Sequence, residues 1–222
     1  MSGGLPIDLI LFAMVAAFLV LRLRSVLGRR TGFERPRQTE AAPGAPVPAV
    51  AREAEALPPP APGAARRTIP DQHSPTGQAL MRIRAVDPSF DPAAFLGGAE
   101  GAFRMIVEAF ARGDRATLRD LLSDDAFASF EAAITAREQA GETQRTELRA
   151  IHEMGIEAAD LRGTIADVTV RIVSDQVNLT IARDGSISAG AEAVTEITDV
   201  WTFQRDLSVS DPTWKLVGTR SA

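Results

Sequence analysis

The prolines of this chain are concentrated in one stretch, which limits where a compact domain can form. Eleven of the 14 prolines lie between residues 36 and 88, among few large apolar side chains. Such a stretch cannot bury enough apolar surface to offset the entropy lost on ordering it. The three prolines at 58–60 favour a stiff spacer, although polyproline can also bind an aromatic groove. We expect a disordered linker, basic and then Pro- and Ala-rich, over residues 25–88, and one folded domain over residues 89–222.

An unbroken apolar run, LILFAMVAAFLVL, occupies residues 9–21 ahead of this linker. Together with its flanking apolar residues, the run reaches the length of roughly 17 residues that a tilted helix needs to cross a bilayer core. The basic residues follow the run instead of preceding it, which argues against a cleavable signal peptide. A buried helix of a soluble protein would rarely be apolar on every side. We therefore expect a transmembrane anchor over residues 1–24.

Arginines cluster directly after the apolar run, at Arg22, Arg24, Arg29 and Arg30. Basic residues beside a membrane span are retained in the cytoplasm. This order predicts a single-pass protein of the inner (plasma) membrane, with its N-terminus outside and its folded domain in the cytoplasm. The same four side chains are also expected to contact anionic lipid at the membrane surface.

Charge is divided unevenly along the chain, whose formal net charge is −5. Residues 88–222 contain 13 Lys or Arg and 22 Asp or Glu, a net charge of −9, and the first 87 residues have a net charge of +4. An acidic domain without a basic patch interleaved with aromatic residues does not attract a polyanion, so we expect no nucleic-acid partner. The absence of cysteine excludes a disulfide framework and thiol chemistry.

Helical spacing of apolar residues marks the first half of the folded domain. Asp91 and Pro92 form a helix start signal, and Gly113 is placed to end that helix. Asp114 and Ser123 are expected to begin two further helices, the last ending by residue 141. The inner stripe of the first helix is predicted to consist of Phe95, Ala99, Phe103, Ile106, Val107 and Phe110.

After residue 141 the apolar period changes from helical to twofold, which is typical of strands. One predicted strand has the even-numbered residues 148–156 on its apolar face, including His152. In the next, apolar residues are even-numbered over 168–172 and odd-numbered over 177–181. This change predicts a bulge at 173–176 in one long bent strand, or alternatively a turn between two short strands. With turns at Asp184-Gly185 and Asp211-Pro212, the pattern predicts an α+β fold, with helices on one face of a mostly antiparallel sheet.

Three stretches together resemble the Tim forty-four family, and more closely its membrane-anchored alphaproteobacterial members. They are the apolar run with its arginines, the helix FLGGAEGAFRMIVEAFARGDRATLRDLL, and the closing pair EITDVWTFQRDL and DPTWKLVGTR. The resemblance implies a cone of the nuclear-transport-factor-two type, whose curved sheet and long first helix enclose an apolar pocket. It also implies a membrane-associated adaptor, resembling the import-motor tether, that contacts lipid and a protein partner such as a translocase component, a chaperone or a membrane protein.

Large apolar side chains at the closing end of the sheet and on the long helix are the candidate walls of that pocket. The same side chains could instead fill the core, and His152 could be a buried histidine with satisfied hydrogen bonds. The candidate binding residues are Phe103, Ile106, Phe110, His152, Trp201, Phe203 and Trp214.

Cone folds of this kind also include isomerases and dehydratases, which use a carboxylate or a histidine inside an apolar pocket. His152 and Asp199 are the residues that such an enzyme would use here, although an exposed strand aspartate is the more frequent outcome. The sequence contains no phosphate loop, dinucleotide fingerprint, nucleophile elbow or metal-ligand spacing. We therefore expect a binding module with no cofactor and no metal, and keep a pocket enzyme of the isomerase or dehydratase type as the alternative.

Overall fold

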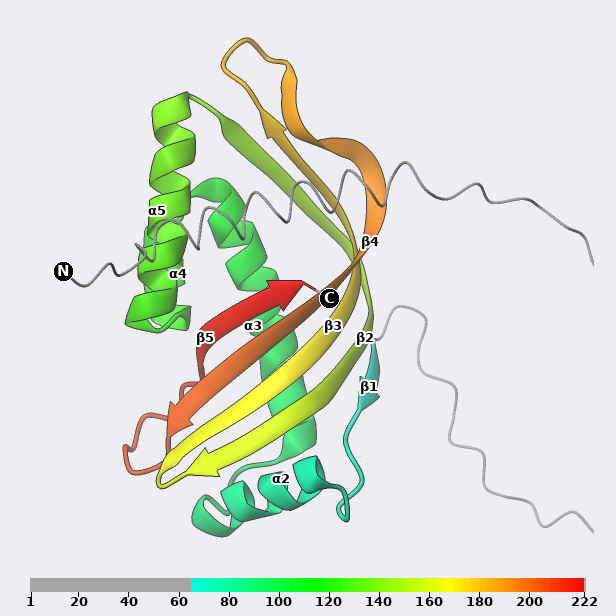
Figure 1. Ribbon diagram of the computed structural model, residues 1–222, viewed down its shortest axis with the longest axis vertical. Coiled ribbons are helices and arrows are strands. Elements are labelled where there is room, and N and C mark those ends of the chain that lie inside the picture. The colour runs from blue at the N-terminus through cyan, green and yellow to red at the C-terminus, as the bar shows by residue number, and fades with distance from the viewer. Residues whose placement is uncertain (1–64, 222) are drawn as a thin grey trace, which may run out of the picture. The chain divides into compact units, whose positions relative to one another are not determined.

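The computed structural model describes residues 65–221, which form an α+β domain with its helices before most of its strands (Figure 1). The helices are α2 (Pro75–Val86), α3 (Pro92–Arg112), α4 (Arg115–Leu121) and α5 (Asp124–Ala140). The strands are β1 (Arg66–Thr68), β2 (Thr143–Arg162), β3 (Ile165–Ile181), β4 (Ile187–Asp206) and β5 (Lys215–Ser221). The predicted α+β class is confirmed.

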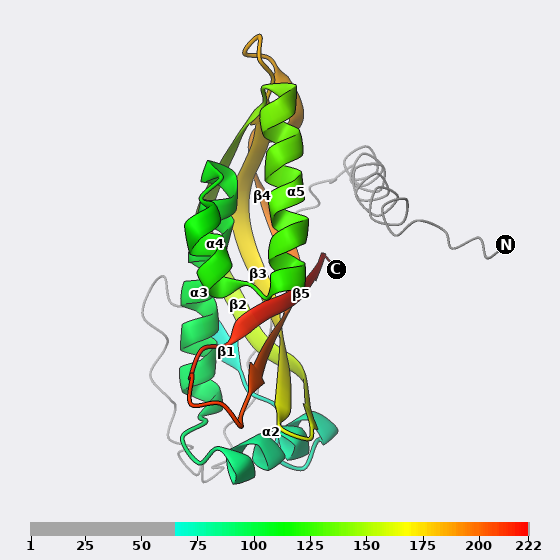
Figure 2. The same ribbon diagram turned by 90° about the vertical axis from the view of Figure 1, so that its left-hand side faces the viewer.

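The five strands form one sheet in sequence order, and every neighbouring pair is antiparallel except β1 with β2. The helices α3, α4 and α5 lie on the same side of this sheet, and α4 and α5 stand in front of its upper strands in Figure 2. Side chains from α3 and from the facing side of β2, β3 and β4 make the core, with Phe103, Ile172 and Phe203 at most 1% exposed. The core therefore lies between the long helix and one face of the bent sheet.

The predicted helix boundaries are confirmed by their caps. The Asp91 carboxylate accepts a hydrogen bond from the backbone N–H of Ala94 at 2.7 Å, and Pro92 is the first residue of α3. The same helix ends at Gly113, whose φ of 72° is a left-handed conformation that glycine adopts without steric cost. Asp114 and Ser123 cap α4 and α5 as expected.

The expected linker boundary at residue 88 is wrong, because the domain begins earlier. Both β1 and α2 lie in that stretch, and β1 pairs with residues 153–155 of β2. Leu80 and Ile83 of α2 are 4% and 0% exposed. The prolines here flank the helix, since Pro75 occupies its first turn and Pro88 follows its end. Because of the high proline content, the sequence pattern did not predict α2, a short helix with one apolar stripe.

The expected anchor over residues 1–24, with its arginines, and the linker as far as residue 64 lie outside the described residues. Between residues 65 and 221, none of the helices combines the length and the apolar character that a membrane crossing requires.

The predicted long strand is confirmed in β3, but its bulge is misplaced. The extra residues belong to the neighbours of β3: β2 has register shifts at 148/150, 151/153 and 156/158, and β4 has extra residues opposite 176–178 and 180–181 of β3. The apolar parity of β3 changes because Ser174 and Gln176 occupy the positions that face the helices. The register shifts of β2 lie beside the strong bend of the sheet in Figure 1, whereas the one opposite residues 180–181 lies next to the β3–β4 turn.

Candidate functional site

The side chains predicted to line a pocket pack against one another instead. The rings of Phe103 and Trp201 lie 4.7 Å apart between centroids, and the Phe95 ring lies 5.0 Å from Trp214 and 6.0 Å from Phe203. Exposure is 5% or less for Phe103, Ile106, Trp201 and Phe203. The half-buried Phe110 contacts Phe130 of α5, with centroids 5.1 Å apart. This arrangement agrees with the interpretation of these residues as core.

His152 does not accompany these residues, because its side chain lies on the opposite face of the sheet and is 47% exposed. The residue is the extra one in a β2 bulge: Ile151 pairs with Ser174 and Glu153 with Val173, so His152 has no partner of its own. Ile151 takes the inward position and is 4% exposed. The placement of His152 on the apolar face is therefore wrong, because simple alternation does not pass through a bulge.

A group of polar side chains follows the apolar core along the inner face of the sheet. Successive residues of a strand alternate between faces, so Ser174, Gln176 and Asn178 share a face with the buried Ile172. Asp199 pairs directly with Ile172 across β3 and β4 and shares that face. The inner face thus changes from apolar under α3 to polar beyond Ile172.

These four polar residues are joined by hydrogen bonds. The Gln176 amide nitrogen donates to Ser174 Oγ at 2.9 Å and reaches Asp199 Oδ2 at 3.4 Å. The Asn178 amide donates to Gln176 Oε1 at 2.9 Å. Ser174 and Gln176 are 0% and 5% exposed, so these bonds satisfy groups that water does not reach freely. We call Ser174, Gln176, Asn178 and Asp199 the inner polar cluster.

Burial raises the pKa of Asp199 to about 6, and hydrogen bonds from Gln176 and Ser221 oppose that shift only in part. A carboxyl group with this pKa can take up and release a proton close to neutral pH. Asp199 was the sequence candidate for a proton acceptor, and the other three members of the cluster were not. The sequence signal for these three is the run of polar residues on the even-numbered positions of β3 after Ile172, a pattern that also predicts a bulge.

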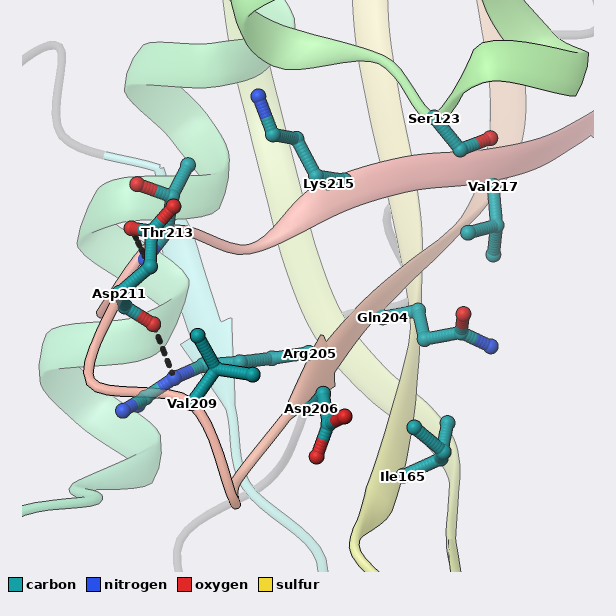
Figure 3. A pocket seen from close by; sticks show the side chains of 10 residues that line it. All are labelled: Ser123, Ile165, Gln204, Arg205, Asp206, Val209, Asp211, Thr213, Lys215 and Val217. Atoms are coloured by element: carbon teal, nitrogen blue, oxygen red, sulfur yellow. Dashed lines mark hydrogen bonds between the residues drawn. The ribbon is translucent and has the colours of Figure 1, made fainter.

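Two surface hollows among the described residues lie away from the predicted pocket residues. One, of about 320 Å³, lies between α3 and β2 and is lined by Arg104, Val107, Glu108, Thr146 and Leu148. The other, of about 260 Å³, lies where β4, β5 and the loop between them meet the start of α5 (Figure 3). Its lining mixes charged, polar and aliphatic side chains: Ser123, Ile165, Gln204, Arg205, Asp206, Val209, Asp211, Thr213, Lys215 and Val217.

Arg205, in the wall of the second hollow, connects three segments of the domain. Its guanidinium donates to Asp87 Oδ2 at 2.9 Å and, through Nε, to the backbone carbonyl of Asp211 at 3.1 Å. Figure 3 shows the Asp211 contact at the turn before β5. Hydrogen bonds from Ser89 lower the pKa of Asp87, and the charge of Arg205 lowers it further. Arg205 therefore joins the end of α2 to the closing pair of strands.

These observations define a class of protein: an α+β domain whose helices cover one face of a mostly antiparallel, bulged sheet, with Trp201 and Trp214 packed at its closing end. Residues 76–221 match the family described as Tim44-like domain. That match spans well over half of the chain, so the chain belongs to the Tim44-like family. The resemblance to this family, which was inferred from the apolar run, the long helix and the closing pair together, is confirmed at the level of the family.

Comparison with curated proteins finds no match. Among solved structures, the intermembrane space region of the chloroplast protein ARC6 is similar, with a TM-score of 0.43 and 12% identity over 60% of this chain and 98% of that one. A protein of the NTF2-like family from Streptomyces avermitilis gives a TM-score of 0.37 and 15% identity over 59% of this chain and 97% of that one. A conserved protein from Planctomyces limnophilus gives 0.33 and 16%, over 56% and 94%.

Proposed function

We propose that this chain is a membrane-tethered adaptor, in which a Tim44-like domain binds a protein partner at the cytoplasmic face of the inner membrane. The observation that carries the proposal is the combination of the family match over residues 76–221 with the apolar run and arginines near the N-terminus. The partner is a translocase component, a chaperone or a membrane protein, and lipid is a second ligand.

The packing of the domain supports binding through its surface. The aromatic side chains that could have lined an internal apolar pocket are engaged with one another. Outside the core, α3 exposes Met105 at 48% beside the hollow lined by Arg104, Val107 and Glu108. An exposed apolar side chain beside a hollow that is lined by one basic and one acidic residue suits a protein interface, in which polar groups surround an apolar centre. We therefore assign partner binding to the α3–β2 hollow.

A photo-reactive amino acid in place of Met105, in cells that express the full chain, tests this assignment. Irradiation is expected to give one reproducible protein adduct in the membrane fraction. Ile187 provides a matched control, because it is 49% exposed and lies on the β3–β4 hairpin instead of α3. No adduct from position 105, or the same adducts from both positions, would contradict binding at this hollow.

A pocket enzyme of the isomerase or dehydratase type is the second candidate, and the raised pKa of Asp199 is the observation that favours it. Such an enzyme would use the Asp199 carboxylate to abstract a proton next to a carbonyl group. Turnover of a carbonyl substrate that is lost in Asp199→Asn, while the variant remains folded, would establish this function over the adaptor. We expect no such turnover.

A further inference from the structure

Three potential metal ligands meet on the face of the sheet that is opposite the helices. His152 of β2, Asp175 of β3 and Glu196 of β4 each offer one ligand atom, and these atoms lie within 4.8 Å of one another. His152 Nε2 lies 2.8 Å from Asp175 Oδ2. Asp175 alternates with the inward Ser174 and Gln176, which places it on the outer face. The group is therefore separate from the inner polar cluster.

The backbone brings these side chains together through two different devices. Asp175 and Glu196 are direct cross-strand partners of β3 and β4, so their side chains lie side by side. His152 joins them because it is the extra residue of the β2 bulge, which turns it to the outer face. Metal-ligand spacing in the sequence could not reveal the group, because its members are more than twenty residues apart.

The charges of this group are unbalanced without a cation. Two carboxylates directly opposite each other on neighbouring strands repel, which destabilises the pair. Other acidic residues of the outer face have arginine partners, such as Glu147 with Arg145 and Arg149. Within residues 65–221, the ion pairs include His152 with Asp175 but none that involves Glu196. A cation held between the three side chains would remove this repulsion.

We propose that His152, Asp175 and Glu196 bind a divalent transition metal ion, for which Zn²⁺ is the probe. One imidazole nitrogen and two carboxylate oxygens are a ligand set that zinc accepts, at roughly 2.0–2.2 Å from the ion. With the ion bound, His152 and Asp175 coordinate it instead of contacting each other, and the distance between their ligand atoms lengthens to about 3.3 Å for tetrahedral ligands. Mg²⁺ prefers a nearly octahedral shell of oxygens, so it should bind much more weakly.

The half-exposed positions leave room for further ligands. His152 and Asp175 have side-chain exposures of 47% and 30%, so water can complete the coordination shell. The ion would join β2, β3 and β4 at the bend, where register shifts interrupt the ladder between strands. The proposal assigns a new site on the sheet, and it does not depend on the adaptor function.

Calorimetric titration of Zn²⁺ into the full chain, purified in detergent and without a histidine tag, tests the site. We expect one ion per chain and at least tenfold weaker binding in His152→Ala and in Glu196→Gln. His73 is the only other histidine, so His73→Ala is the matched control and should bind as the wild type does. Equal Zn²⁺ affinity of wild type and His152→Ala, or loss of binding in His73→Ala, would overturn the proposal.

A second measurement distinguishes Zn²⁺ binding from the simple removal of repulsion between like charges. In EDTA, Glu196→Gln should have a higher Tm than the wild type, because the substitution removes the like-charge repulsion. On addition of Zn²⁺ the Tm of the wild type should rise and that of Glu196→Gln should not. A wild-type Tm that is the same in Zn²⁺ and in EDTA would overturn the proposal, whatever the variant does.

Discussion

At the scale of single residues, Asp199 is the side chain whose environment departs most from that of an ordinary carboxylate. It lies at the polar end of the inner face, beside the buried Gln176 and opposite Ile172 on β3. Burial there disfavours its charged form, which is why its pKa is raised to about 6 from 3.8. The domain therefore keeps an ionisable group where an apolar or amide side chain would be tolerated more easily.

The substitution Asp199→Asn should stabilise the domain at neutral pH. Between the unfolded pKa near 3.8 and the folded pKa near 6, the unfolded chain releases a proton that the folded chain retains. The free energy of unfolding of the wild type therefore falls across this window, relative to a neutral side chain. We expect Asn to raise it by about 3 kcal/mol at pH 7.5 and by much less at pH 4. Urea unfolding at the two pH values measures the difference.

Asn also retains an oxygen that can accept from Gln176 and Ser221, so the hydrogen bonds of the cluster are preserved. Asp184→Asn is a control in the exposed β3–β4 turn, where hydrogen bonds from Ser186 lower the pKa of the carboxyl. This variant should not be stabilised at pH 7.5. An Asp199→Asn variant that is less stable than the wild type at pH 7.5 would show that the charged form is favoured by contacts within the cluster.

Residue patterns predicted the caps well and the inner polar cluster poorly. A cap is a local device, in which Asp91 bonds to an N–H three residues away, so its sequence signature is sufficient. His152 is different, because its face depends on a bulge in β2 and on the pairing of β2 with β3. Its side-chain direction is thus set by distant parts of the chain, and strand alternation alone cannot predict it.

At the scale of the elements, α2 is the helix that the proline-rich composition placed in the linker instead of in the folded domain. Its contacts with β2 and its buried Leu80 and Ile83 make it part of the domain core. The helix is capped by Ser74 Oγ, which accepts from the backbone N–H of Gly77 at 3.0 Å. A short helix between prolines has little helical stability of its own, so packing against the sheet stabilises it.

Truncation of Ile83 tests whether α2 contributes to the stability of the domain. Ile83 is 0% exposed, and Ile83→Ala should lower the free energy of unfolding by about 3 kcal/mol through lost burial and the remaining cavity. Met81→Ala on the same helix is the control, because Met81 is 49% exposed and should change stability by less than about 0.5 kcal/mol. Chemical unfolding of the full chain measures both, and equal stabilities would place α2 outside the cooperative unit.

Contacts between elements explain the closing motif. Trp201 and Phe203 enter the core from β4, while Trp214 packs on Phe90 and Phe95 ahead of β5. Arg205 then joins the same strand to Asp87, which lies 118 residues earlier in the chain. The closing motif thus fastens the end of α2 and the start of α3 to β4 and to the segment that leads into β5.

The Arg205–Asp87 pair should contribute measurably to stability because both side chains are shielded from water. Their side-chain exposures are 14% and 15%, and Arg205→Ala removes hydrogen bonds to Asp87 and to the backbone of Asp211. We expect a loss of about 2 kcal/mol. The exposed Arg112–Glu108 pair provides the control, with exposures of 60% and 64% and an expected change below about 0.5 kcal/mol for Arg112→Ala. Similar Tm values for the two variants would contradict this structural role.

At the scale of the whole molecule, the folded domain and the expected anchor are predicted from different kinds of sequence evidence. Periodicity and caps predicted the folded part, and the apolar run, the long helix and the closing pair together indicated its family. The start of the domain was missed because composition averages over many residues, so a twelve-residue helix disappeared in a proline-rich stretch. The expected anchor depends on hydropathy and flanking charge alone, and therefore requires a test in membranes.

The absence of cysteine from this chain makes its membrane orientation directly testable. Ser2→Cys places a single thiol ahead of the apolar run, and Ser210→Cys places one in the exposed segment between β4 and β5. With the N-terminus outside, a membrane-impermeant maleimide should label Ser2→Cys in cells whose inner membrane is intact, and label Ser210→Cys only after lysis. The arginines after the apolar run are the physical reason, because they oppose transfer of that flank across the membrane. Labelling of both thiols without lysis, or recovery of the full chain in the soluble fraction, would contradict a cytoplasmic domain on a membrane anchor.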